Sequence, residues 1–258
     1  MRTFTKLKNF VNVANQYITQ TFRKLQKFPK RLFNLKTMQH HKLKVSKTAH
    51  YYTLGQPTEG VKYFWFVTHG YGQLANHIIR KFEILDTKEH FIVAPEALNR
   101  FYWQFQTNKV GASWMTKNDR LDEIEDYTNY LTHLYQHFTA HLSPNVKIIL
   151  FGFSQGCATQ LRWILRGQPQ FDNLILWGGL LPEDLDYQPF EDYFSTKKID
   201  FIVGDNDEFI NQERIDWHLD FAKNQNLEMN YTLFDGKHEI LTPILSKWIV
   251  DNFIMDNG

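Results

Sequence analysis

Residues 146–156 constrain the fold of this chain more than any other stretch. Residues 146–151 are a short apolar run, typical of a β-strand buried on both faces, and residues 152–156 read Gly-Phe-Ser-Gln-Gly. The G-x-S-x-G pattern is typical of a sharp strand-to-helix turn that holds a serine in strained backbone angles and exposes its hydroxyl. Residues 157–166 follow with helical spacing. The order of strand, turn and helix predicts a nucleophile at Ser154; the alternative is a glycine-rich strand end without chemistry.

Apolar runs of strand length alternate with helix-like segments from residue 63 onward. The predicted buried strands are 63–68, 91–94, 146–151, 173–177, 200–203 and 229–234, and the predicted helices are 76–85, 119–141, 157–166, 210–224 and 240–253. Residues 42–54 alternate imperfectly, which favours a hairpin at the sheet edge. This order predicts an α/β fold with a doubly wound, mostly parallel sheet and helices on both faces. We expect one such domain over residues 38–258.

The first 37 residues differ in composition from the rest of the chain. Residues 1–58 contain 12 Lys and Arg but no Asp or Glu, which leaves 17 basic and 28 acidic residues in the remainder. Within residues 1–28, apolar side chains recur at helical spacing and most basic ones lie opposite, a pattern suited to weak contact with an anionic membrane surface. The segment lacks the continuous apolar core of a signal peptide. Translation from Met38 is the alternative explanation of this leader.

Composition also limits the cofactors and partners to be expected. The excess of acidic residues beyond residue 58 disfavours a nucleic-acid binder. The single cysteine, Cys157, excludes an internal disulfide, and we expect a cytoplasmic protein. No stretch approaches the roughly 18 apolar residues of a transmembrane helix. The sequence shows no metal-ligand cluster and no phosphate-binding glycine loop, so we expect no cofactor.

A second turn, His69-Gly70-Tyr71-Gly72, directly follows the predicted strand 63–68. A glycine-rich turn after an inner strand lets backbone N–H groups point at a ligand oxygen. In hydrolases an H-G-x-G turn at this position supplies one oxyanion donor, which here is the amide of Tyr71. We interpret His69 as a structural residue that holds the loop, with a role as acid or base as the alternative.

Residues 98–118 are rich in aromatic side chains and show no clear periodicity. In a compact domain an irregular connection of this length is commonly a functional loop. We expect it to line a substrate pocket, with Trp103, Trp114 and Met115 as candidate lining residues. The alternative is a flap that packs on the surface.

An alcohol is a weak nucleophile near neutral pH, so Ser154 requires an adjacent base, and the base requires an orienting carboxylate. On the α/β-hydrolase fold these residues occur in the order serine, acid, histidine, each just after a strand. His238 follows the last predicted strand in a glycine-containing loop. His218, the other histidine beyond the acidic turn, lies in a helical segment. We therefore expect His238 to be the base.

The acid lies in the turn at residues 204–210, Gly-Asp-Asn-Asp-Glu-Phe-Ile, in which Asp205 and Asp207 are both candidates. Asp205 is placed to brace the turn through its own backbone amides. A carboxylate that lies beyond the tight turn can reach a histidine arriving from the next strand. We therefore expect Asp207 to be the acid, with Asp205 as the alternative.

Taken together, these motifs resemble those of the phospholipase/carboxylesterase family of α/β-hydrolases, which is related to the acyl-protein thioesterases. The resemblance spans about residues 60–250 and is carried by His69-Gly-Tyr-Gly72, Gly152-Phe-Ser-Gln-Gly156, Trp177-Gly-Gly-Leu-Leu-Pro182, Gly204-Asp-Asn-Asp207 and Gly236-Lys-His238. It implies a triad of Ser154, Asp207 and His238 and a second oxyanion amide from Gln155. The chain departs from the family at Ser113-Trp-Met-Thr116, where the family has a Trp-Phe-Asp-like segment.

The resemblance implies carboxylic esters or thioesters as substrates. We therefore expect a serine hydrolase that acts on a small-molecule ester or thioester through an acyl-enzyme intermediate. A peptidase or amidase on the same fold is one alternative, and a non-catalytic binding protein with the hydrolase fold is another.

Overall fold

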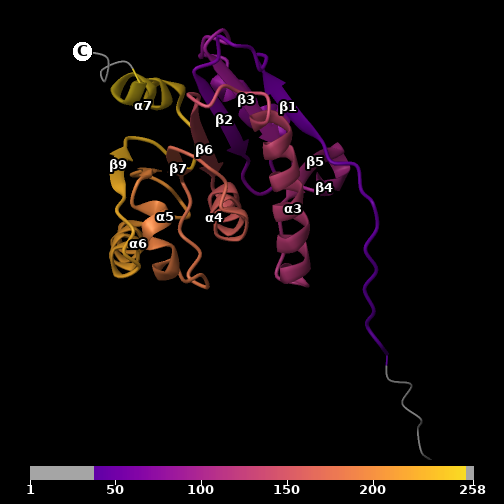
Figure 1. Cartoon of the computed structure of the whole chain (residues 1–258). Helices are drawn as coiled ribbons and strands as arrows, with labels where there is room; N and C mark the ends of the chain where they lie inside the picture. The colour runs from indigo at the N-terminus through magenta and orange to yellow at the C-terminus, as the bar shows by residue number, and fades with distance from the viewer. Residues whose placement is uncertain (1–37, 254–258) are drawn as a thin grey trace, which may run out of the picture. The chain divides into compact units, whose positions relative to one another are not determined.

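The computed structural model describes residues 38–253, apart from the side chain of Phe105 (Figure 1). The predicted leader, residues 1–37, lies outside the described residues and stays a prediction. The described residues from Lys47 onward form one compact unit. Within the described part of the chain, no helix is both long enough and apolar enough to cross a membrane.

A seven-stranded sheet runs through the compact unit in the order β1-β3-β2-β6-β7-β8-β9. Its strands are β1 (Tyr51–Leu54), β2 (Tyr63–Thr68), β3 (His90–Pro95), β6 (Lys147–Phe153), β7 (Asn173–Trp177), β8 (Lys198–Gly204) and β9 (Asn230–Phe234). All neighbouring strands are parallel except β1 and β3. The predicted α/β fold with a mostly parallel sheet is confirmed.

The prediction of a hairpin over residues 42–54 is wrong. Only Tyr51–Leu54 forms a strand, and it pairs antiparallel with β3, so that Leu54 lies opposite Ile92. Residues 42–48 are exposed and in no regular element, so they present no apolar face for a second strand to bury. The edge strand β1 therefore pairs with a strand distant in sequence, β3, and not with a neighbour across a hairpin.

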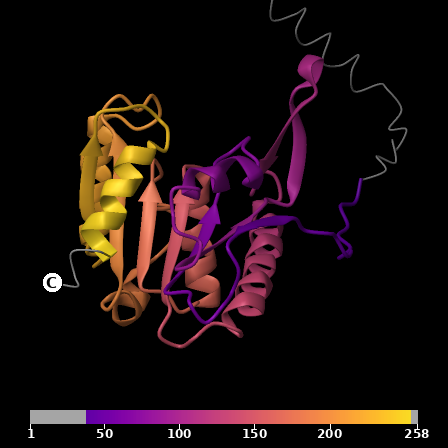
Figure 2. The ribbon, with the colours of Figure 1, turned by 90° about the horizontal axis from the view of Figure 1, so that it is seen from above.

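Helices cover both faces of the sheet (Figures 1 and 2). One face carries α3 (Arg120–Thr139), α4 (Gln155–Gly167) and α6 (Gln212–Asn224), and the other carries α2 (Ala75–Ile78), η1 (Ile79–Phe82) and α7 (Thr242–Phe253). The segment predicted as one helix at residues 76–85 is thus a short α-helix followed by a 3-10 helix. Phe64 and Phe66 of β2 pack with the first group, whereas Trp65 and Val67 pack with the second. Burial on both faces explains the continuous apolar runs of the sequence.

Residues 98–118 are not the irregular loop expected from the sequence. They contain a two-stranded antiparallel sheet of β4 (Asn99–Gln104) and β5 (Lys109–Ser113), joined by the 3-10 turn Phe105–Thr107. The last three residues of β4 are all exposed, and a bulge follows Tyr102, so the usual alternation of a strand is missing. This β4–β5 hairpin lies beside α3, outside the main sheet (Figures 1 and 2).

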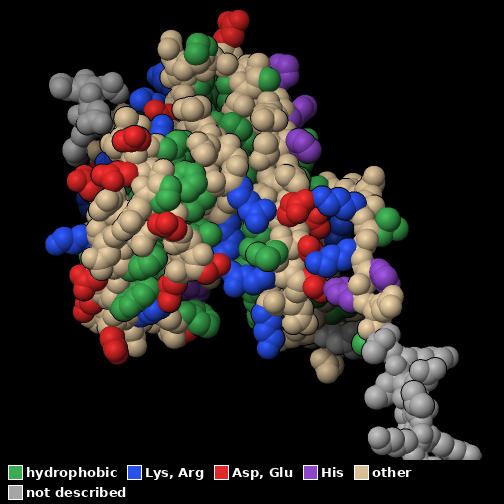
Figure 3. Space-filling view, turned by 60° about the horizontal axis from the view of Figure 1, so that its bottom comes forward, with side chains coloured by type: hydrophobic (Ala, Val, Ile, Leu, Met, Phe, Trp, Pro, Cys, Tyr) green, Lys and Arg blue, Asp and Glu red, His purple; other side chains and the backbone are tan. Residues whose placement is uncertain are grey.

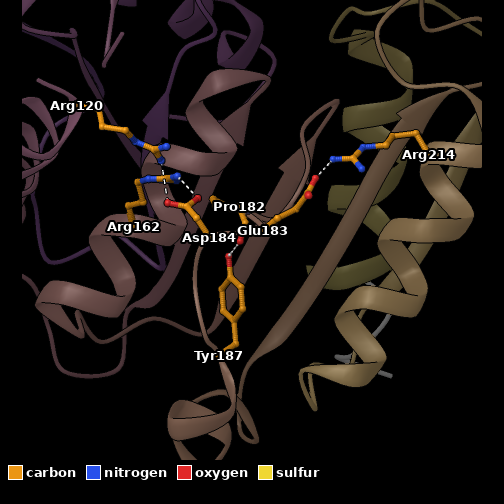
Figure 4. A network of polar contacts seen from close by, with 7 residues as sticks. All are labelled: Arg120, Arg162, Pro182, Glu183, Asp184, Tyr187 and Arg214. Carbon is orange, nitrogen blue, oxygen red and sulfur yellow. Dashed lines mark hydrogen bonds and ion pairs between the residues drawn. The ribbon is translucent and has the colours of Figure 1, made fainter. Parts of the chain in front are cut away.

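Ion pairs to three helices hold the segment that follows β7 (Figure 4). Asp184 pairs with Arg120 of α3 at 2.8 Å and with Arg162 of α4 at 2.5 Å. Glu183 pairs with Arg214 of α6. Arg162 is 5% exposed, so loss of Asp184 would leave a buried charge without its partner. Acidic and basic side chains also lie side by side on the face of the molecule that Figure 3 shows.

Two short helices, η3 (Gln188–Phe190) and α5 (Glu191–Phe194), separate this segment from β8. The segment leaves the carboxyl end of β7, where the Ser154 N–H donates to the Trp177 carbonyl at 2.9 Å. The ion pairs therefore fix a segment that begins next to the Ser154 turn.

Candidate active site

Ser154 lies at a sharp turn between β6 and α4, with backbone angles φ 53° and ψ −119°. This is a strained conformation for a residue with a side chain. The surrounding backbone approaches the turn closely: a Cβ on Gly156 would lie 2.3 Å from the Thr68 carbonyl oxygen, and one on Gly152 would lie 2.6 Å from Cys157 Cα. Packing therefore requires both glycines of the motif, while the serine side chain stays partly exposed.

Three side chains from separate loops form one chain of hydrogen bonds. Nε2 of His238 lies 2.9 Å from Ser154 Oγ, and Nδ1 lies 2.7 Å from Asp207 Oδ2. Because a carboxylate can only accept hydrogen bonds, Nδ1 donates to Asp207 and Nε2 is left to accept from the serine hydroxyl. The loops after β6, β8 and β9 thus bring together a hydroxyl, a base and a group that orients the base.

The two candidate acids have different partners. Asp207 Oδ1 accepts from the N–H groups of Phe209 at 2.8 Å and Ile210 at 3.1 Å, which leaves Oδ2 for the histidine. Asp205 instead accepts from the Gly236 N–H at 3.1 Å through Oδ1. Asp205 therefore joins the two turns that carry the acid and the histidine, and it makes no contact with His238.

Aromatic rings flank the imidazole of His238. Its ring centroid lies 5.0 Å from that of Phe153 and 4.7 Å from that of Phe209. The side chain of His238 is 11% exposed and that of Asp207 is fully buried, whereas Phe209 is 71% exposed. The sequence analysis missed Phe209, and its position two residues after Asp207 is the signal that points to it. Phe209 thus presents an exposed aromatic ring beside His238.

The backbone N–H groups of Tyr71 and Gln155 donate to no acceptor among the described residues. Gln155 is the first residue of α4, where the helix dipole favours a negative charge. The Tyr71 turn is braced from within, because the Gly70 N–H donates to Gln73 Oε1 at 3.0 Å. The two amides named from the sequence are therefore both available to an oxyanion.

His69 is completely buried and bonded through both ring nitrogens. Nδ1 donates to the Gly70 carbonyl at 2.8 Å, and Nε2 accepts from the Ala97 N–H at 3.0 Å. Burial lowers the pKa of His69 from 6.5 to about 4, so the ring is neutral at pH 7. This arrangement supports the interpretation of His69 as a structural residue of the loop.

The three predicted pocket residues differ in how far they are exposed. Trp103 is 45% exposed and packs over Gly72, with its ring centroid 5.6 Å from that of Tyr71. Met115 is half-buried against the core. Trp114 is 1% exposed and belongs to the hydrophobic core, and its indole N–H donates to the His69 carbonyl at 2.8 Å. Trp103 therefore presents part of its ring to solvent beside the Tyr71 turn, whereas Trp114 supports the loop from inside.

The described residues contain no group of three or more His, Cys, Asp or Glu side chains that could hold a metal ion. A cavity of about 560 Å³ lies at the end of α6, with Leu219, Leu227 and Met229 among its lining residues. It shares no residue with the hydrogen-bonded chain at Ser154. The cavity therefore plays no part in the site described here.

The parallel sheet, the strained serine turn and the order of Ser154, Asp207 and His238 are those of the α/β-hydrolase fold. A family model described as "Serine hydrolase (FSH1)" matches residues 68–249, more than half of the chain. The chain therefore belongs to the serine hydrolase (FSH1) family. No curated protein sequence matches it.

Solved structures support the resemblance to phospholipase/carboxylesterase and acyl-protein thioesterase proteins. Zea mays acyl-protein thioesterase 2 is 15% identical with a TM-score of 0.62, over 80% of this chain and 99% of that chain. A phospholipase/carboxylesterase from Dyadobacter fermentans is 20% identical with a TM-score of 0.57, over 82% and 99% of the two chains. The Bacillus cereus carboxylesterase is 12% identical with a TM-score of 0.57, over 80% and 95%. At these identities the likeness shows the fold.

Proposed function

We propose that this serine hydrolase cleaves carboxylic esters or thioesters through a covalent acyl-enzyme on Ser154. The observation that carries the proposal is the hydrogen-bonded chain from Ser154 Oγ through His238 to Asp207. A serine hydroxyl becomes a useful nucleophile when an adjacent base takes its proton, and the base needs an orienting partner.

In the proposed reaction, His238 Nε2 takes the hydroxyl proton as Ser154 Oγ attacks the acyl carbonyl carbon. The carbonyl oxygen becomes an oxyanion, held by the N–H groups of Tyr71 and Gln155. Protonated His238 then gives its proton to the leaving alcohol or thiol as the bond to the acyl carbon breaks. A water molecule, deprotonated by the same nitrogen, then attacks the acyl carbon. The bond from this carbon to Ser154 Oγ breaks as His238 returns the proton to Oγ, and the carboxylic acid is released. Asp207 accepts from Nδ1 throughout and stabilises the charged imidazole.

The side chains around Ser154 favour an apolar substrate group. Tyr71, Trp103 and Phe209 are all large and exposed, and each lies on a loop or strand next to the proposed machinery. Aromatic side chains bind apolar groups through the area that they bury. We therefore propose an ester or thioester with an uncharged acyl or alcohol group, bound with Trp103 and Met115 on the hairpin side.

The test is hydrolysis of a p-nitrophenyl ester, with labelling by a fluorophosphonate probe measured in parallel. Replacing Ser154 by Ala should abolish both signals. Ser195→Ala is a matched control, because Ser195 is exposed and bonds only to a nearby backbone carbonyl. Hydrolysis that survives Ser154→Ala would refute the assignment of the nucleophile. A wild-type chain that binds such esters without cleaving them would favour the non-catalytic alternative.

A peptidase or amidase is the second candidate on the same geometry, since Ser-His-Asp chemistry also cleaves amides. Faster cleavage of aminoacyl amides than of short esters would favour it over the ester proposal.

A further inference from the structure

Residues 112–115, which we call the bridge segment, contact the turn that carries the Tyr71 amide. The Gly72 N–H donates to the Ala112 carbonyl at 2.8 Å, and the Ala112 N–H donates to the Gln73 carbonyl at 3.1 Å. Both backbone polar groups of Ala112 are therefore bonded to this turn. The turn is thus held directly after Tyr71.

The bridge segment also holds the turn on the other side of Tyr71. The indole N–H of Trp114 donates to the His69 carbonyl at 2.8 Å, and the two rings lie 5.0 Å apart. Because Trp114 is 1% exposed, water does not compete for this bond. Tyr71 is therefore flanked by two attachments to the same four-residue segment.

The second candidate oxyanion amide belongs to Gln155, and its side chain reaches the same segment. Gln155 Oε1 accepts from the Trp114 N–H at 3.1 Å, and Nε2 donates to the Met115 carbonyl at 2.9 Å. The side-chain amide thus bonds two consecutive residues of the bridge segment. Gln155 would offer its backbone N–H to the oxyanion while its side chain fastens the bridge segment.

An oxyanion hole works only if both donors lie about 2.7–3.1 Å from one developing negative oxygen. Tyr71 follows β2 and Gln155 follows β6, so their loops are separate in sequence. The bridge segment bonds to both loops. We propose that this segment sets the separation of the two oxyanion amides and that the Gln155 side chain is the positioning residue of the pair. This inference rests on the proposed function of the site.

The experiment compares Gln155→Met with Gln160→Met. Both residues lie on α4, and both donate from Nε2 to backbone carbonyls, but Gln160 bonds to Phe66 and Phe151 of the main sheet. Methionine keeps the length of the side chain and removes its hydrogen bonds. The control therefore loses a buried contact of the same helix without touching the bridge segment.

We expect Gln155→Met to lower kcat by roughly 10- to 100-fold with KM changed less than about threefold, because a displaced donor costs less than the roughly 10²–10³ lost with a removed one. Affinity for a boronic acid that forms a tetrahedral adduct should fall by the same factor as kcat/KM. Gln160→Met should lower the melting temperature without changing either value. An unchanged kcat in Gln155→Met, measured well below its melting temperature, would overturn the inference.

Amide hydrogen exchange separates this inference from the proposed function. Gln155→Met should speed exchange of the amides of residues 72–73 and 112–115, and Gln160→Met should not. If Ser154→Ala retains hydrolysis, the proposed function fails, yet the exchange result still decides whether the side chain fastens the segment. If exchange in Gln155→Met is unchanged at residues 72–73 and at residues 112–115, the inference is overturned.

Discussion

The nucleophile side of the candidate site and its oxyanion side are held by different kinds of contact. Ser154, Asp207 and His238 lie one to four residues beyond β6, β8 and β9. These strands belong to the continuous parallel ladder, which aligns their carboxyl ends at one edge of the sheet. The position of the proposed triad therefore follows from the topology of the whole domain.

The oxyanion side is completed by a structure outside that ladder. The Tyr71 turn follows the inner strand β2, but its outer attachments go to the β4–β5 hairpin. A few hydrogen bonds and the packing of Trp103 over Gly72 join the two. Substitutions in the hairpin should thus change kcat or selectivity by modest factors, whereas substitutions in the proposed triad should lower turnover by orders of magnitude.

The largest expected effect is on the nucleophile side, in Asp207→Asn. The asparagine keeps the shape of the side chain but allows the wrong tautomer of His238, which in a comparable triad costs about 10⁴ in kcat. Turnover of one ester should fall by a factor of that order while the fold is retained. Asp205→Asn is the control, because its amide oxygen can still accept from Gly236. A large loss of turnover in the control with little in Asp207→Asn would reverse the assignment.

The sequence suffices to propose the nucleophile side because each of its features is local. The elbow glycines, the order of strands and the single histidine in the last loop are all visible as residue types at fixed spacing. The sequence of residues 98–118 does not reveal the hairpin, since β4 exposes consecutive side chains and lacks the alternation of a half-buried strand. The hydrogen bonds from residues 112–115 to Gly72 and Gln155 join positions far apart in the chain, so no local sequence pattern predicts them. The sequence placed Trp103 and Trp114 in one pocket, although only the first is exposed.

The second effect is a loss of stability on the oxyanion side, in Trp114→Ala. Removing a buried aromatic side chain costs about 3–5 kcal/mol. Here the indole also donates to the His69 carbonyl, which would be left without that donor. Urea unfolding should show a free energy of unfolding that is lower by this amount, and therefore a lower midpoint concentration. A melting temperature near wild type, with only the preference for acyl chains altered, would return Trp114 to the pocket wall.

Acid should weaken the fold through three buried histidines, His69, His90 and His218. Burial lowers the pKa of each from 6.5 to about 4. The unfolded chain therefore takes up protons as the pH falls below 6.5, while the folded chain does so only near pH 4. Stability is fully present above pH 6.5 and declines toward pH 4, by about 1.4 kcal/mol per pH unit for each histidine. Urea unfolding at pH 7, 6 and 5 measures this decline.

Two variants separate the contribution of His69, on the oxyanion side, from that of His90, on the other face of the sheet. His69→Gln and His90→Gln should each reduce the acid-induced loss of unfolding free energy by about a third, because each removes one of the three histidines. His69 holds the Tyr71 turn, whereas His90 accepts from Trp65 on the far face of the sheet. Only His69→Gln should also lower kcat at pH 7. Equal activity in the two variants would show that the turn does not depend on His69.

The smallest expected effect is a change of selectivity in Trp103→Ala. Trp103 is 45% exposed, so its removal should alter the free energy of unfolding by less than about 1 kcal/mol. Its ring lies over Gly72 and faces Tyr71, where an acyl chain bound at Ser154 could contact it. The ratio of kcat/KM for p-nitrophenyl octanoate to that for the acetate should fall by on the order of tenfold.

Tyr102→Ala is the matched control for this change. Tyr102 is 58% exposed and directly precedes Trp103 in β4. Phe101 and Trp103 both contact Tyr71 at ring distances of 5.4 and 5.6 Å, which identifies the face directed at the oxyanion turn. The octanoate-to-acetate ratio should therefore change in Trp103→Ala and stay near wild type in Tyr102→Ala. Equal changes in both variants would mean that the hairpin acts through its stability and not through contact with the acyl chain.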